Sequence, residues 1–203
     1  MTLPGFFQGT EMPDAGWWEA LWPDPVHVLS ESGLTPGVTA IDLCAGNGWF
    51  TLPMAKVARR VMAIDIDRAL LDIAQRRVAE AGLDNCAFVV TDACDLAKVV
   101  TEPVGFVFLA NAFHGVPDRT RLCHSVAKIL APGGQFAIVN WHQKPREETT
   151  VLGQPRGPKM ELRMSPNDVR AAVEPSGLRL VRVVEIPPYH YSAVFRREGT
   201  SSA

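Results

Sequence analysis

The sequence predicts an α/β fold, a mostly parallel sheet with helices on both faces and an antiparallel hairpin strand at its C-terminal end. Three observations indicate this class. Short apolar runs alternate with segments of helical periodicity over residues 38–141. A glycine-containing turn joins the first apolar run to a helix. The last two runs, 178–186 and 189–195, meet at Pro187-Pro188, and so short a connection implies an antiparallel hairpin.

Length, charge and cysteine content exclude several classes of protein. The 203 residues suit one domain with a sizeable core, and a net charge of -2 gives no general attraction to nucleic acid or anionic membranes. Cys44, Cys86, Cys94 and Cys123 lack C-x-x-C spacing, so we expect reduced, mostly buried thiols and no metal site. No signal-peptide pattern occurs, and the longest apolar run, 104–113, is too short to span a bilayer. We therefore expect a cytoplasmic protein.

The N-terminal segment, residues 1–23, combines glycine and proline with many aromatic side chains. Phe6, Phe7, Trp17, Trp18 and Trp22 are too apolar for a solvated tail, so they must pack on the rest of the chain. The residues alone favour a strap that covers an edge of the core; a lid over a ligand site is the alternative that the resemblance carried by the later motifs implies.

The stretch that follows begins the predicted sheet. A helix is expected over 24–32, capped by Asp24, with Val26 and Leu29 facing the sheet. A strand over 38–43, a tight turn over 44–48, a helix over 49–58 and a strand over 61–66 then form the layout of a mononucleotide-binding unit. A nicotinamide-binding loop would need a third glycine where Thr51 stands.

The remaining elements alternate in the same way. We expect helices over 68–81, 119–130 and 166–175, strands over 87–90, 104–110 and 135–141, and a turn over 131–134. Parallel sheets bind ligands at the carboxyl ends of their strands, so residues just after 90, 110 and 141 should face a ligand.

Four landmarks resemble the class I S-adenosylmethionine-dependent methyltransferases of the small-molecule type. Residues 42–48, Asp-Leu-Cys-Ala-Gly-Asn-Gly, are similar to the family's first motif. Asp65 resembles its ribose-binding acid, Asp92 its adenine-binding acid (with Asp95 as a rival), and residues 131–134 its Pro-Gly-Gly turn. The resemblance covers residues 26–195. It implies a Rossmann-like seven-stranded sheet, a single methyltransferase domain over 1–203, S-adenosylmethionine as cofactor and S-adenosylhomocysteine as product.

The resemblance also implies the residues of the site. The expected cofactor-binding residues are Asp42, Cys44, Ala45, Gly46, Asn47, Gly48, Asp65, Ile66, Asp92, Ala93 and Asn111. The expected substrate-binding residues are Trp18, Phe113, Trp141 and Tyr189. His114 and His142 are the candidate catalytic bases, because histidine titrates near neutral pH. Cys44 departs from the family pattern, since a glycine usually stands there and its Cβ and sulfur narrow the approach to the methionine moiety. A reactive thiol at Cys44 is the weaker alternative.

Residues 143–164 are the least regular part of the prediction, and the family often inserts substrate-binding structure here. The segment mixes lysine and arginine with glutamate. It is either a solvated loop or a substrate loop that favours an anionic group. A nucleic-acid surface is less favoured, because no exposed aromatic residues are interleaved with the basic ones. Residues 196–203 are expected to form a flexible tail.

The implied function is transfer of a methyl group to a small-molecule acceptor by in-line displacement. The alternatives are a tRNA or protein methyltransferase, which needs a docking surface, and a non-catalytic binder of the cofactor or its product. We expect a monomer or homodimer with no membrane partner.

Overall fold

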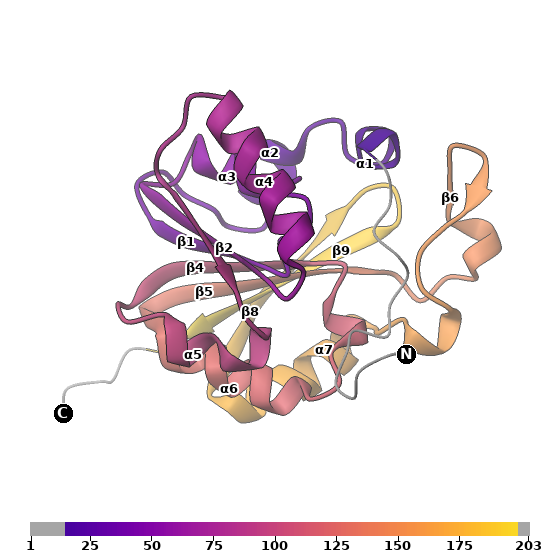
Figure 1. Ribbon diagram of the computed structural model, residues 1–203. Coiled ribbons are helices and arrows are strands. Elements are labelled where there is room, and N and C mark those ends of the chain that lie inside the picture. Colours follow the sequence, from indigo (N-terminus) through magenta and orange to yellow (C-terminus); the bar gives the residue numbers. More distant parts are fainter. Residues whose placement is uncertain (1–14, 199–203) are drawn as a thin grey trace.

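The computed structural model describes residues 15–198 (Figure 1). Its sheet has seven strands in the order β3-β2-β1-β4-β5-β9-β8. The strands are β1 Thr39–Leu43, β2 Arg60–Asp65, β3 Cys86–Val90, β4 Val104–Ala110, β5 Leu130–Trp141, β8 Leu178–Ile186 and β9 His190–Arg197. The first five are parallel, and β9 runs antiparallel to both β5 and β8. The predicted fold class is confirmed.

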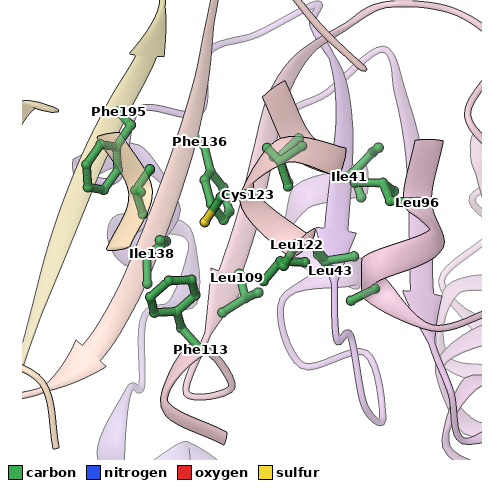
Figure 2. Close-up of a cluster of buried hydrophobic side chains, with 14 of the residues drawn as sticks. Ile41, Leu43, Leu96, Leu109, Phe113, Leu122, Cys123, Phe136, Ile138 and Phe195 are labelled. Carbon is green, nitrogen blue, oxygen red and sulfur yellow. The ribbon is translucent and has the colours of Figure 1, made fainter. Parts of the chain in front are cut away.

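Helices cover both faces of the sheet (Figure 1). One face carries α1 Ala15–Leu21, α2 Pro25–Glu31, α3 Thr51–Ala55 and α4 Arg68–Glu80. The other carries α5 Leu96–Val99, α6 Arg119–Ile129 and α7 Pro166–Val173. Alternate residues of β4 serve the two cores, with Phe106 and Phe108 toward α1–α3 and Val107 and Leu109 toward α5–α7. Figure 2 shows the second of these cores.

Three predicted helix starts have the expected caps. The carboxylate of Asp24 accepts the backbone N–H of His27 at 3.0 Å. Asp118 accepts that of Arg121 at 2.9 Å. Ser165 forms a reciprocal capping box with the third residue of α7.

Several predicted boundaries and orientations were wrong. The helix expected over 49–58 shrinks to α3, because the glycine turn extends through residue 50. Val26 is 42% exposed, since α2 turns Val28 and Leu29 toward the core instead. The turn over 131–134 is a bulge inside β5, whose pairing with β4 resumes at Gln135. Strand β9 extends through residues 196 and 197, which were expected to belong to a flexible tail; residues 199–203 lie outside the described part.

The segment 143–164 is more ordered than its sequence predicts. It holds η3 Arg146–Glu148, a small hairpin of β6 Thr150–Val151 and β7 Gln154–Pro155, and η4 Met160–Leu162. Arg163, only 3% exposed, ties the segment together. Its guanidinium donates to the carbonyl oxygens of Pro158, His142 and Arg156 at 3.1, 3.3 and 3.0 Å, and to Oγ1 of Thr149 at 2.8 Å. This network fixes the backbone of the segment, while most of its side chains are exposed.

Gly48 is required where the glycine turn packs on α4. Its φ is +79°, and a Cβ there would lie 2.7 Å from Cβ of Ala74. We expect Gly48→Ala to lower the free energy of unfolding by about 2–4 kcal/mol, through overpacking and left-handed strain. Urea unfolding followed by circular dichroism measures the loss. The matched control is Gly82→Ala, with φ +71° and open space, which should lose only about 1–2 kcal/mol. Equal losses would contradict the packing argument.

Candidate active site

A cavity of about 760 Å³ opens at the carboxyl ends of the central strands. This volume is typical of small-molecule sites. Twelve of the residues expected at the site line it: Trp18, Asp42, Cys44, Ala45, Gly46, Asp65, Ile66, Asp92, Ala93, Asn111, His114 and Trp141. Five do not: Asn47, Gly48, Phe113, His142 and Tyr189. The end of the sheet therefore brings together most of the predicted site.

Asp65 joins the end of β2 to the glycine turn. One carboxylate oxygen accepts the backbone N–H of Gly46 at 2.8 Å, and the other accepts that of Asp67 at 2.9 Å. Burial raises the pKa of Asp65, and these backbone donors oppose the rise. Each oxygen keeps a lone pair for a ligand, so this fixed carboxylate can accept hydrogen bonds from a diol.

Asp42 is a buried carboxylate on β1, only 3% exposed. Its Oδ2 accepts the hydroxyl of Thr51 at 2.6 Å. Burial raises its pKa from 3.8 to about 7; the Thr51 hydrogen bond opposes the rise, and the charge of Asp65 adds to it. Thr51 occupies the position where a dinucleotide loop would carry its third glycine, and here it serves to orient a carboxylate.

Cys44 and Asn111 follow the adjacent strands β1 and β4 in the same unusual conformation. Their φ angles are 59° and 56°, in the left-handed region that disfavours residues other than glycine. Such strain gathers at functional sites. Burial and the neighbouring charges of Asp65 and Asp42 raise the pKa of the Cys44 thiol, which argues against a reactive thiolate. Within residues 15–198, neither amide atom of Asn111 has a hydrogen-bond partner, so both are available to a ligand.

Asp92 lines the cavity, whereas its rival Asp95 does not. One oxygen of Asp92 accepts the N–H of Cys94 at 2.7 Å, so this residue also caps the short 3₁₀ helix η1 Ala93–Asp95. Asp95 instead pairs with Arg121 and with Lys98. The turn after β3 therefore offers the cavity one carboxylate.

The two candidate bases lie in different places. His114 lines the cavity, and burial, aided by the charges of Arg119 and Arg163, lowers its pKa to about 4. It is therefore neutral at pH 7. His142 lies outside the cavity, with Nε2 2.8 Å from Oε2 of Glu185 on β8. Neighbouring strand residues point to opposite faces, so Trp141 enters the cavity and His142 does not.

Four other expected residues support the site from outside. Phe113 is fully buried in the core beside Leu109 and Ile138 (Figure 2). Tyr189 stacks on Trp141, with ring centroids 6.1 Å apart, and donates its hydroxyl to the carbonyl of Thr150 at 3.0 Å. The carbonyl of Asn47 accepts a hydrogen bond from Arg77 of α4. Gly48 packs on the same helix, as described above.

An aromatic wall completes the cavity, and most of it was not predicted residue by residue. Trp17, Trp18, Trp49 and Phe50 all line the space. Trp18 stacks on Trp49 with centroids 6.4 Å apart, and α1 contacts β6. The aromatic N-terminal segment was the available signal for Trp17. Phe6 and Phe7 lie outside the described residues.

The arginines that line the cavity, Arg146 and Arg156, were also missed as individual residues, although their segment was singled out.

Over residues 15–198, no cluster of histidine, cysteine and acidic side chains is placed to hold a metal. The same part of the chain has no helix long and apolar enough to cross a bilayer. Cys94 and Cys123 are buried, and Cys44 and Cys86 are partly buried.

The cavity at Asp65, the glycine turn, the parallel strand ends and the antiparallel final hairpin are the features that the resemblance to methyltransferases implies. Residues 40–134 match the family model described as "Methyltransferase domain". The structure is similar to that of a SAM dependent methyltransferase from Aquifex aeolicus, with a TM-score of 0.75 and 25% identity. The likeness covers 91% of this chain and 94% of the Aquifex chain. Residues 40–134 therefore carry a methyltransferase domain, and the likeness in structure to S-adenosylmethionine-dependent methyltransferases extends over most of the chain.

Two curated relatives match part of the chain. A ubiquinone biosynthesis O-methyltransferase of Xanthomonas axonopodis pv. citri is 28% identical over 64% of this chain and 57% of its own length. An uncharacterized protein of Mycobacterium tuberculosis is 28% identical over 61% of this chain and 44% of its own. The chain thus spans about half the length of the curated relatives it matches.

Proposed function

We propose that this protein transfers the methyl group of S-adenosylmethionine to a small-molecule acceptor. The proposal rests on one observation. Asp65, Asp92 and Asn111 line the same cavity, and each lies at the carboxyl end of a different strand of the sheet. Their chemistry fits the parts of the cofactor in order. Asp65 suits the ribose hydroxyls, Asp92 the adenine amine, and the two unpaired amide atoms of Asn111 the amino-acid end.

The cofactor supplies a methyl group that its sulfonium already activates. The protein's contribution is alignment and exclusion of water, which together can supply several kcal/mol of the barrier. Trp17 and Trp18 of α1 and Trp49 of the turn before α3 line the cavity. The position of the α1 tryptophans supports a lid function for the N-terminal segment. His114 is the proposed base, because it lines the cavity and is neutral at pH 7. Its lowered pKa of about 4 makes it a weak base, so it would take the proton of the methyl acceptor only as the new bond forms.

A small acceptor is favoured over RNA or protein because α1 and the segment 143–164 enclose the cavity from two sides. Of the two curated relatives described above, the Xanthomonas axonopodis enzyme is named for ubiquinone biosynthesis, which concerns a small molecule. From that name we take for this chain only the class of methyl acceptor, a small molecule, and not the compound itself.

The test follows a labelled methyl group from S-adenosylmethionine into three fractions of a cell extract: RNA, protein, and low-mass compounds from which the unreacted cofactor has been removed by chromatography. We expect label in the low-mass fraction and at least tenfold slower labelling by His114→Asn, with unchanged calorimetric affinity for S-adenosylhomocysteine. Label in RNA or protein would support the alternative enzymes. Cofactor binding without transfer to any fraction would support a non-catalytic binder. Unchanged turnover by His114→Asn would remove that residue as the base.

A further inference from the structure

We infer that the acceptor carries an anionic oxygen group, a carboxylate or a phosphate, on a flat apolar body, and that Arg146 and Arg156 bind this group. The inference rests on the proposed function and names its substrate class. Both arginines belong to the segment after β5, and both line the cavity.

One hydroxyl holds the two arginines close together. Oγ1 of Thr149 lies 3.1 Å from the carbonyl oxygen of Arg146 and 2.9 Å from that of Arg156. The backbone N–H of Arg156 also donates to the carbonyl of Thr149 at 2.9 Å. Arg163 donates a hydrogen bond to the same hydroxyl, and its Cζ lies 5.1 Å from the centroid of the Trp141 ring. The backbone that presents the two guanidinium groups is therefore fixed before any ligand binds.

Within residues 15–198, the two side chains have no hydrogen-bond or ion-pair partner. The Nε atoms of Arg146 and Arg156 are buried and have no hydrogen-bond acceptor among the described residues. Neither arginine takes part in any ion pair found in residues 15–198. Burying an unpaired donor of a charged group is unfavourable, and an anionic ligand removes that penalty. Paired guanidinium forks match the geometry of a carboxylate or phosphate.

Charge is divided between the two ends of the cavity. Its acidic residues are Asp42, Asp65, Asp67 and Asp92, all at the ends of β1, β2 and β3. Its two arginines lie past the end of β5. A cationic cofactor at the acidic end and an anionic acceptor at the basic end would therefore each face side chains of opposite charge.

The tryptophans argue for a flat acceptor. Four of the chain's five tryptophans line the cavity. Close packing holds the Trp141 ring in place. Gly157 lies so close that a Cβ on it would be 2.8 Å from the ring, and Tyr189 stacks on the ring at an interplanar angle of 12°. A cavity wall made of fixed aromatic rings favours a flat apolar body. The apolar wall thus selects the body of the acceptor, and the arginines select its charge.

The experiment measures quenching of tryptophan fluorescence as benzoate, phenyl phosphate or neutral benzamide is added to protein saturated with S-adenosylhomocysteine. We expect an anionic probe to bind and benzamide to bind at least tenfold more weakly. Arg146→Gln and Arg156→Gln should each weaken binding of the anionic probe about tenfold and abolish the preference over benzamide. The stronger of the two anions identifies the group. Arg76→Gln, an exposed position on α4 outside the cavity, is the control and should change nothing.

Two results would overturn the inference. One is equal or absent binding of all three probes. The other is that the arginine variants weaken S-adenosylhomocysteine binding tenfold and spare the probes, which would assign the arginines to the cofactor's own carboxylate. Calorimetry of S-adenosylhomocysteine alone separates these failures from failure of the proposed function, in which the parent protein would not bind that compound.

Discussion

Asp65→Ala is expected to lower the affinity for S-adenosylhomocysteine by about 100-fold. The substitution removes the acceptor for two ribose hydroxyls, and hydrogen bonds to a charged group contribute about 1.5–3 kcal/mol each. It also frees the N–H groups of Gly46 and Asp67, which the carboxylate now fixes at 2.8 and 2.9 Å. The loss therefore combines a missing contact with a loosened turn. Isothermal titration calorimetry measures the affinity.

The control is Asp72→Ala on the neighbouring helix α4. Asp72 forms an exposed pair with Arg68 at 2.9 Å, outside the cavity, and such surface pairs contribute little. A second ligand isolates the ribose contact. The 2′,3′-dideoxy analogue of S-adenosylhomocysteine should bind the parent far more weakly than the natural compound, and Asp65→Ala should bind both alike. If the variant keeps the parent's preference for the ribose hydroxyls, another residue binds them.

The sequence predicts the strand ends well because the physics there is local. Asp65 and Asp92 follow apolar runs whose length and spacing are visible in the sequence. Parallel strands then bring such ends to one edge of the sheet. Asn111 was found in the same way, as the residue that ends a run apolar on both faces. The unusual left-handed backbone at Asn111 and Cys44 is a property of the folded turn, and no residue pattern indicated it.

Side-chain direction was harder to predict than position. Trp141 and His142 are neighbours, yet only Trp141 enters the cavity, because the pleat sends them to opposite faces. Phe113 also lies next to a cavity residue, His114, and points into the core (Figure 2). Which face a given strand end presents depends on register with the neighbouring strand, and a single sequence does not carry that information.

Long-range polar contacts explain the rest of what was missed. Arg163 orders the segment 143–164 through carbonyl groups 5 to 21 positions away in the chain. Such contacts leave no periodicity, so the segment resembled a loop of mixed charge. The positions of Arg146 and Arg156 in the cavity depend on that ordering.

Asp42→Asn is expected to stabilise the protein and impair cofactor binding at the same time. The folded state raises the pKa of this carboxyl from 3.8 to about 7. Below pH 4 both the folded and the unfolded states hold the proton, so the carboxyl carries no penalty. Between pH 4 and 7 the unfolded state ionises and the folded state does not, so stability falls as pH rises. Above pH 7 the accumulated loss is constant, on the order of 4 kcal/mol.

Asparagine imitates the protonated form, because its Oδ1 can still accept the hydroxyl of Thr51. Urea unfolding of parent and variant should therefore differ little at pH 4 and by several kcal/mol at pH 8, with Asp42→Asn the more stable. Both proteins contain His114, whose lowered pKa makes stability rise between pH 4 and 6.5, so its contribution cancels in the difference. The exposed Asp84→Asn is the control and should show no such pH-dependent gain.

Asp42→Asn is expected to impair cofactor binding, although it raises the free energy of unfolding. An ionised Asp42 attracts a sulfonium cation, whereas the sulfur of the demethylated product is neutral. The parent's preference for S-adenosylmethionine over S-adenosylhomocysteine should therefore grow as pH rises through 7, and Asp42→Asn should show no such growth. If the variant were less stable than the parent at pH 8, or kept the pH-dependent preference, the buried charge would not reside on Asp42. If both expectations hold, the chain keeps an unfavourable buried carboxylate because the cationic cofactor needs it.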